Sequence, residues 1–265
     1  MRYGAMNFPV LPVLAEIDCY ADLGFDYLEL AMDPPQAHHS LLRLQKDDIS
    51  RALRAKGMGL VCHLPTFVGT ADLTESLRRA SVAEMHASLR LAADLGAEKV
   101  VLHPSMVGGM GPFVLPLVKQ LAFDFLAEMV AAADKLGLVI CLENMFPRNL
   151  LGVLPEDFTE IFHAFPSLKL TLDSGHAHID DSKGDRLQQL VQKFGRRIGH
   201  LHFSDNKGRR DDHLALGKGT INFQKLVRSL KEVGYDDTLT LEVFDQDRSR
   251  LVAGREQLKK LFARE

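Results

Sequence analysis

The stretch LVICLENMFPRNLLGVLPEDFTEIFHAFPSLKLTLD, residues 138–173, contains one complete strand–helix–strand pattern. Two apolar runs of strand length, residues 138–144 and 168–173, flank a segment in which LPED (154–157) marks a helix start, because proline and acidic residues are favoured in a first turn. Both runs are nearly continuous in apolar residues, which is typical of strands buried on two faces. The pattern therefore predicts two parallel strands joined by a crossover helix.

The same pattern recurs along the whole chain. Apolar residues between Val82 and Leu95 repeat every three or four positions, and Gly96 then ends the predicted helix. Glycines in LGF, LGA, LGL and VGY precede several of the strands. The other strand-length runs are RYGAM (2–6), YLELAM (27–32), GLVCHLP (59–65), KVVLHPS (99–105), IGHLHFSD (198–205) and LTLEVF (239–244).

Eight strands that alternate with eight helices, without a linker, predict one α/β domain over residues 1–265 with the (β/α)₈ TIM-barrel fold. The alternative is a doubly wound open sheet, which shares the strand–helix alternation. Such a sheet seldom needs eight regular repeats, and no GxGxxG motif follows the first strand. In a barrel, we expect the chemistry at the C-terminal ends of the strands.

The composition is that of a globular protein with a substantial core: 46% of residues are hydrophobic and 25% are charged. There is no apolar run of membrane-spanning length and no basic-then-apolar leader, so we expect no membrane association and no secretion. Cys19, Cys62 and Cys141 are odd in number and lack CxxC spacing, which favours a reducing cytoplasm. The net charge of −3 argues against a surface that binds nucleic acid as a whole.

Residue types that bind metal ions stand at the end of nearly every apolar run from the third onward. The C-terminal ends of the strands meet at one rim of a barrel, so these side chains should converge. Side-chain alternation places Glu143 on the face of Cys141, and Glu242 on the face of Thr240, consistent with both carboxylates pointing into the barrel. The full set is His63, His103, Glu143, Asp173, His176, His202, Asp211, His213 and Glu242.

A carboxylate buried at this rim needs a partner, because desolvation of an unpaired charge costs several kcal/mol. A divalent cation held by Glu143, Asp173, His202 and Glu242 is the simplest such partner. Mixed carboxylate–imidazole sites suit Mn, Co, Zn or Fe, and oxygen-rich sites also admit Mg. One Glu or His at a strand end is more often a hydrogen-bonded rim residue; the convergence of several predicts the metal site.

Two neighbouring groups of polar residues are not assigned to the metal ion. His200 points the same way as His202 but deeper, so we interpret it as a hydrogen-bonded core histidine. Lys207, Arg209 and Arg210 follow the seventh strand on the active rim. They form either a solvated loop or a site for an anion or phosphate.

The runs CLEN (141–144), TLDSGHAHI (171–179), HLHFSDN (200–206), HLALGKGTINF (213–223) and LTLEVF (239–244) resemble the xylose-isomerase-like barrel superfamily. This superfamily includes sugar and sugar-phosphate isomerases and epimerases, and also apurinic-site endonucleases of the endonuclease IV type. The resemblance covers essentially the whole chain. Its motifs are specific for the superfamily and much less specific for an activity.

In the isomerase and epimerase branch, the resemblance implies one divalent metal ion on Glu143, Asp173, His202 and Glu242. The two glutamates would exchange protons with a substrate carbon from opposite sides, and His176 would contact the sugar. A metal ion that binds the carbonyl and a neighbouring hydroxyl lowers the energy of an enediolate, and a positioned carboxylate moves the proton. The partner would be a small-molecule sugar.

The endonuclease branch implies a trinuclear zinc site and a DNA partner. All nine positions of its pattern are filled in this sequence, by the nine rim residues given above. The motif DDH (211–213), followed by LGKG (216–219), is especially close. In that chemistry clustered zinc ions activate a hydroxide and stabilise the charge that develops on the phosphodiester.

Three features favour the sugar branch. The chain is acidic overall, and the loops after the first two strands lack the basic and aromatic segments that hold a bent duplex. The segment NMFPRNLLGVLPEDF (144–158) departs from the endonuclease continuation, while GHAHI (175–179) resembles the small-molecule branch. We therefore predict a metal-dependent sugar isomerase or epimerase, with the nuclease as the alternative.

Two further hypotheses remain. Other small-molecule chemistries of the superfamily, such as the dehydration of a polyol, use similar residues. A non-catalytic barrel that binds a metal ion or a sugar would not need both Glu143 and Glu242, so the presence of both argues against it. Barrels of this kind often form dimers, which makes a homodimer an expected assembly.

Overall fold

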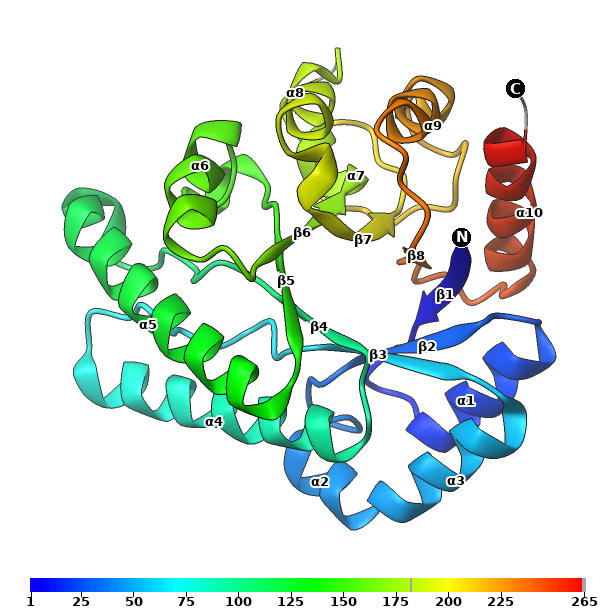
Figure 1. Ribbon diagram of the computed structural model, residues 1–265, viewed down its shortest axis with the longest axis horizontal. Coiled ribbons are helices and arrows are strands. Elements are labelled where there is room, and N and C mark those ends of the chain that lie inside the picture. The colour runs from blue at the N-terminus through cyan, green and yellow to red at the C-terminus, as the bar shows by residue number, and fades with distance from the viewer. Residues whose placement is uncertain (182, 264–265) are drawn as a thin grey trace.

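Eight parallel strands close into a barrel in the computed structural model, which describes residues 1–181 and 183–263. Each strand pairs with its neighbour in the sequence, and β8 pairs with β1 to close the ring, so the predicted barrel is confirmed (Figure 1). The strands are β1 (Arg2–Met6), β2 (Tyr27–Ala31), β3 (Gly59–His63), β4 (Lys99–Leu102), β5 (Val139–Glu143), β6 (Lys169–Asp173), β7 (Ile198–Phe203) and β8 (Thr238–Leu241).

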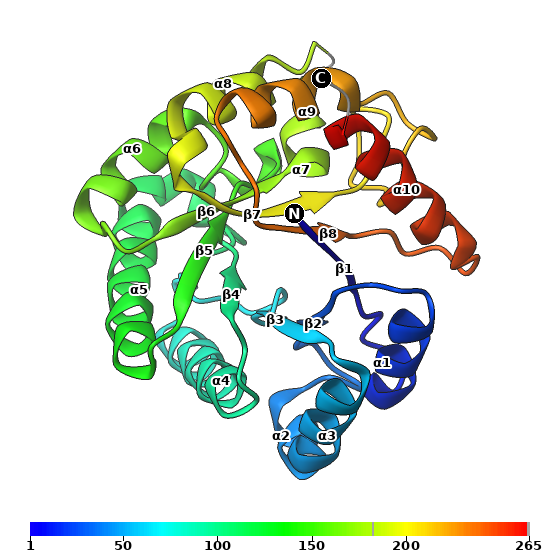
Figure 2. The ribbon, with the colours of Figure 1, turned by 45° about the vertical axis from the view of Figure 1, so that its right-hand side comes forward.

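Helices surround the strands on the outside of the barrel (Figure 2). The prediction of one helix after each strand is incomplete, because α2 and α3 both lie between β2 and β3, and α7 and α8 both lie between β6 and β7. None of the helices in the described residues combines the length and apolar character that crossing a bilayer demands. The helices are α1 (Val13–Asp22), α2 (His39–Leu44), α3 (Lys46–Lys56), α4 (Glu75–Asp94), α5 (Leu115–Leu136), α6 (Pro155–Ala164), α7 (Ser174–His178), α8 (Asp185–Phe194), α9 (Phe223–Glu232) and α10 (Ser249–Ala263).

Helix starts follow local signals in the sequence. Pro155 occupies the first turn of α6, and the Asp157 carboxylate accepts hydrogen bonds from the backbone N–H groups of Val153 and Leu154, both at 3.0 Å. The side chain of Asn222 caps α9 by accepting from the Lys225 N–H at 2.9 Å. These caps fix where the chain leaves the rim of the barrel and turns back along its outside.

Side chains alternate between two environments along the strands. Outward-facing residues such as Leu28, Leu142 and Leu172 are buried in one large apolar core between the strands and the helices. Inside the barrel, Tyr27 and Val101 belong to a second, much smaller apolar cluster. The remaining interior, toward the C-terminal ends that we call the barrel mouth, carries polar side chains.

Strand register brings these polar side chains to one level. Asp173 of β6 lies beside His202 of β7, and His202 lies beside Thr240 of β8. Because barrel-facing positions alternate along each strand, the residues two positions earlier, Thr171 and His200, also face inward and pair with each other. The register therefore stacks polar residues in layers below the barrel mouth.

A glycine on β1 leaves the space that the Tyr27 ring fills. A Cβ at Gly4 would lie 2.2 Å from Cε2 of Tyr27, which is far inside van der Waals contact. We predict that Gly4→Ala lowers the free energy of unfolding by about 1–3 kcal/mol, as overpacked core sites do. Urea denaturation followed by circular dichroism measures this change.

Gly108→Ala is the matched control, because a Cβ at Gly108 meets no atom within 4 Å. Its free energy of unfolding should stay within about 0.5 kcal/mol of the wild type, as surface substitutions usually do. If Gly4→Ala were as stable as the control, the Tyr27 ring would not need this space.

Candidate metal centre

The structure brings the nine predicted rim residues together at the barrel mouth. His63, Glu143 and Asp173 are the last residues of β3, β5 and β6, while His202 is the penultimate residue of β7. Two positions differ slightly from the sequence prediction, because β4 ends at Leu102 and β8 ends at Leu241. His103 and Glu242 are thus the first residues beyond their strands, His176 lies in α7, and Asp211 and His213 lie in the β7–α9 loop.

Three carboxylates surround one nitrogen of His202. Its Nδ1 lies 3.1 Å from Glu143 Oε1, 3.4 Å from Glu242 Oε2 and 3.8 Å from Asp173 Oδ2. One ligand atom from each of these four residues can be chosen so that all lie within 4.8 Å of one another. Glu143, Asp173 and His202 are buried, and the Glu242 side chain is 12% exposed. This spacing suits a single metal ion bound by three carboxylates and one imidazole.

Glu143 is at the centre of the wider cluster. Its Oε1 also lies 3.3 Å from His176 Nδ1, and its Oε2 lies 3.0 Å from His103 Nε2 and 3.3 Å from His63 Nε2. Burial opposes ionisation of Glu143, but the neighbouring imidazoles, His202 and His103 foremost, outweigh it and hold the pKa of this carboxyl well below its usual value. Glu143 is therefore an ionised carboxylate held by four histidines.

A third group forms around the β7–α9 loop. Asp211 Oδ2 lies 3.1 Å from His176 Nε2 and 3.0 Å from His213 Nε2, and the His213 backbone adopts a positive φ of 45°. The loop is anchored by Asp205, whose carboxylate accepts hydrogen bonds from the N–H groups of Gly217, Gly219 and Ile221 as well as Asn206.

Three carboxylate oxygens of this cluster are buried and have no hydrogen-bond donor among the described residues: Asp173 Oδ2, Asp211 Oδ1 and Glu242 Oε2. Buried acceptors normally find a partner, and charged ones pay a large desolvation cost without it. Burial raises the pKa of the Asp173 carboxyl to about 7, with the charges of Glu143 and Glu242 adding to the effect against His176. The residues therefore fit a divalent cation, which would satisfy these oxygens.

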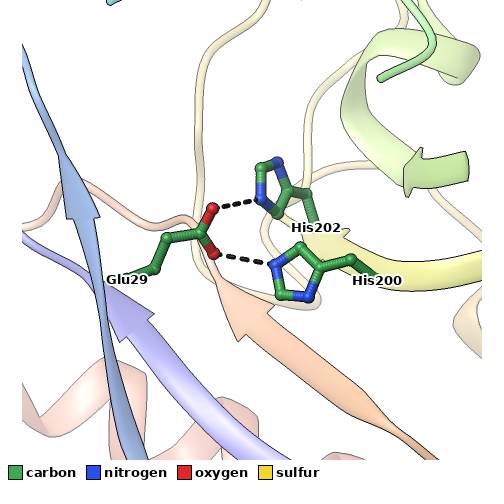
Figure 3. Close-up of side chains that lie close together, drawn as sticks. All are labelled: Glu29, His200 and His202. Carbon is green, nitrogen blue, oxygen red and sulfur yellow. Dashed lines mark hydrogen bonds and ion pairs between the residues drawn. The ribbon is translucent and has the colours of Figure 1, made fainter. Parts of the chain in front are cut away.

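A tenth residue, Glu29 of β2, belongs to this region and was not found from the sequence. Its side chain is fully buried, and Figure 3 shows its two oxygens directed at His202 and His200. Oε1 lies 2.9 Å from His202 Nε2, and Oε2 lies 2.9 Å from His200 Nε2. The available signal was a glutamate inside the apolar run YLELAM, on the same face as Tyr27 and Ala31. His200 is the hydrogen-bonded core histidine that the sequence predicted.

A cavity of about 310 Å³ lies above the cluster. Glu242 lines it, whereas Glu143, Asp173 and His202 lie outside its lining. The other rim residues that line the cavity are His63, His103, His176, Asp211 and His213, and much of its wall is apolar, including Phe8, Phe67, Phe146 and Phe244.

No lysine or arginine of the described residues lines this cavity. Lys207, Arg209 and Arg210, for which the sequence allowed an anion-binding role, are exposed on the β7–α9 loop. Arg210 Nε lies 3.9 Å from Asp212 Oδ1. The cavity thus offers acidic and imidazole groups at one end and apolar walls around them.

The chain belongs to the family described as xylose isomerase-like TIM barrels, whose model matches residues 17–262. Uncharacterized protein MJ1311 of Methanocaldococcus jannaschii is 30% identical over 251 residues, which are 91% of this chain and 83% of the relative. A crystal structure of a D-tagatose 3-epimerase-like protein superimposes with a TM-score of 0.88 at 28% identity, covering 98% of this chain and 97% of the other.

Two more distant relatives carry names from different functional classes. An inosose isomerase of Bacillus subtilis is 25% identical over 65% of this chain and 63% of its own length. A probable endonuclease 4 of Mycoplasmoides gallisepticum is also 25% identical, over 81% of this chain and 76% of its own length. Pairwise identity therefore does not distinguish the two activities.

Metal binding and stability should be coupled through Asp173. Its folded-state pKa of about 7 lies above the usual value of about 4, so in the metal-free protein this group lowers stability as pH rises from about 4 to about 7, and the loss then levels off. We predict that Asp173→Asn raises the melting temperature of the metal-free protein at pH 8. The same variant should lose most of the stabilisation that the wild type gains from added Zn²⁺ or Mn²⁺.

That gain in the wild type should be about 2.7 kcal/mol at a metal concentration 100 times the Kd. Asp26→Asn is a suitable control, because Asp26 accepts from the Tyr3 N–H at the opposite end of the barrel and should leave the metal response intact. Differential scanning fluorimetry with EDTA or added metal measures both effects. A wild-type melting temperature that changes with neither EDTA nor added metal would contradict the assignment of a metal site.

Proposed function

We propose that this protein is a divalent-metal-dependent isomerase or epimerase of a small, unphosphorylated sugar. One observation carries the proposal: Glu242, with a buried and unpartnered carboxylate oxygen, lines a small cavity directly above the Glu143–Asp173–His202 cluster. A proton-accepting group therefore meets the substrate space at the edge of the candidate metal centre. The resemblance to a D-tagatose 3-epimerase-like structure supports the same class of reaction.

The cavity favours a neutral, monosaccharide-sized substrate. Its volume of about 310 Å³ is near the lower limit of ligand pockets. Among the described residues no lysine or arginine lines it, so it lacks the side chains that most often bind a phosphate group. The polar side chains of Asp33, Ser105 and Asn149 line the cavity and can bind hydroxyl groups, while the rings of Phe146 and Phe244 can pack against the carbon skeleton.

A divalent cation bound by Glu143, Asp173, His202 and Glu242 would polarise the substrate carbonyl and lower the energy of an enediolate. Glu242 is the first base in this proposal, because it is the glutamate that faces the cavity. Glu143 is the second proton carrier. It lies beneath His63 and His103, which line the cavity and contact Glu143 Oε2. The apolar walls restrict water access to the reacting carbon.

Proton transfer can be tested with Glu242→Gln and Glu143→Gln. Each change keeps the size of the side chain and one oxygen but removes the base, so solvent-deuterium exchange into a bound ketose should fall by about 10²–10⁴-fold. NMR of the recovered sugar measures the exchange, at metal concentrations that saturate each variant. Ketohexoses such as tagatose and fructose serve as probes.

Glu84→Gln provides the matched control. Glu84 is also a carboxylate bound by two imidazoles, those of His38 and His39, but it does not line the cavity. The rate of deuterium exchange in the Glu84→Gln variant should equal that of the wild type. Exchange at the wild-type rate in metal-loaded Glu242→Gln would remove Glu242 from the proton-transfer role.

A second candidate function is phosphodiester hydrolysis at three zinc ions. It is favoured by the contacts of His63 and His103 with Glu143, and of His176 and His213 with Asp211, which complete the nine-residue set. The lack of a cavity-lining lysine or arginine among the described residues argues against a phosphate backbone as ligand. Both candidates use the same four central residues.

The number of bound metal ions separates these candidates. We expect elemental analysis of the purified, zinc-loaded protein to give one tightly bound ion per chain, and we expect no cleavage of an abasic-site duplex. About three zinc ions per chain together with cleavage of that duplex would establish the nuclease instead. His213→Gln is informative, because it should leave one-metal binding intact but remove a ligand of a three-metal site.

A further inference from the structure

A continuous chain of hydrogen bonds runs through the barrel interior beneath the candidate metal centre. At its lower end, Lys99 Nζ lies 2.7 Å from Asp237 Oδ2 and 3.1 Å from Thr238 Oγ1. Thr238 Oγ1 lies 2.7 Å from His200 Nδ1. Glu29 then connects His200 to His202, as Figure 3 shows. The side chains of this chain are buried, and we call the five residues the interior column: Lys99, Thr238, His200, Glu29 and His202.

The two charged residues of the column, Lys99 and Glu29, determine the direction of its hydrogen bonds. An ammonium group only donates, so the Thr238 hydroxyl oxygen accepts from Lys99, and its own hydrogen is available for His200 Nδ1. An ionised carboxylate only accepts, so both imidazoles must present an N–H to Glu29. His200 and His202 therefore both carry a hydrogen on Nε2.

The hydrogen on Nε2 leaves the other ring nitrogen of His202 free to act at the barrel mouth. A metal-bound histidine is neutral, and in that state the Nε2–H tautomer of His202 presents the lone pair of Nδ1 on the side of Glu143, Asp173 and Glu242. That nitrogen is the atom best placed to bind a cation among the three carboxylates. Metal-bound histidines commonly donate their second N–H to a carboxylate, which fixes the tautomer and the ring orientation.

We propose that Glu29 is the positioning residue of the metal centre: it holds His202 in the Nε2–H tautomer and so makes Nδ1 the metal-binding atom. The proposal rests on the metal centre of the proposed function. Thr238 and Lys99 set the direction of the hydrogen bond to His200, whereas the tautomer of His202 is set by its contact with Glu29. Glu29 does not line the cavity, so its effect reaches the substrate only through His202.

The substitution Glu29→Gln tests this because an amide has one accepting and one donating end. His200 still accepts from Thr238 at Nδ1, so it still donates from Nε2. The acceptor of that hydrogen bond is now the amide oxygen of the glutamine. The amide NH₂ then faces His202 and turns Nε2 into an acceptor. His202 must carry its hydrogen on Nδ1, where it can donate to Glu143 but cannot bind a metal ion.

Zn²⁺ affinity, measured by competition with a chromogenic chelator, should fall about 10- to 100-fold in Glu29→Gln. Thr238→Val is the matched control. It removes a buried hydroxyl from the same column but leaves Glu29 and its bond to His202, so its Zn²⁺ affinity should equal that of the wild type. The double variant should recover part of the lost affinity, because His200 is then free to accept from the amide.

A second measurement does not depend on metal. Long-range ¹H–¹⁵N NMR of the metal-free protein, assigned with His202→Asn, shows whether His202 Nε2 carries a hydrogen. We expect a hydrogen in the wild type and in Thr238→Val, and none in Glu29→Gln. If Glu29 had only a structural role, Glu29→Gln would change the melting temperature but leave the hydrogen on His202 Nε2.

The results separate the two proposals. A wild type that binds no Zn²⁺ would contradict the metal centre, while the NMR result would still decide the tautomer. Wild-type Zn²⁺ affinity in Glu29→Gln, or a hydrogen on His202 Nε2 in that variant, would overturn the positioning role. An equal loss of affinity in Thr238→Val would also overturn it, because the effect would then come from the loss of any polar group in the column.

Discussion

The burial of the Glu143 carboxylate among four imidazoles is the constraint on which the rest of the barrel mouth depends. An ionised group without water must be surrounded by donors or cations, and those around Glu143 come from positions at or just beyond the C-terminal ends of the strands. His63, His103, His176 and His202 come from four different segments to meet this one group. The fold and the chemistry are thus linked through a requirement for charge compensation.

The sequence predicted the parts of this structure that repeat or lie at strand ends. Eight apolar runs with glycine stops indicate a barrel because periodicity is a local property, and polar residues that close those runs must reach the mouth. Glu29 was missed because it lies in the middle of a strand, where one acidic residue in an apolar run belongs to no local pattern. Its partners, His200 and His202, are more than 170 residues away, and only the closed barrel brings them within hydrogen-bonding distance.

Features that depend on the shape of the loops could not be predicted from the sequence either. The spacing of residues gave Glu143 and Glu242 equivalent roles, but the structure places only Glu242 of the two at the cavity. Likewise, Lys207, Arg209 and Arg210 follow a strand that leads to the mouth, yet their loop carries them away from the cavity lining. Where a loop folds back, as this one does around Asp205, proximity in sequence does not give proximity in space.

In most barrels of this kind the two ends are independent: one end serves stability, and the other can exchange its loops to acquire new chemistry. Glu29 reduces that independence here, because it lies buried inside the barrel and its carboxylate contacts His202 at the mouth. Replacing Glu29 with an apolar residue in a redesigned interior would therefore alter reactivity as well as stability. Replacing rim loops, in contrast, would change substrate choice while the buried column kept the imidazole in place. New specificities in this scaffold are more accessible through its loops than through its core.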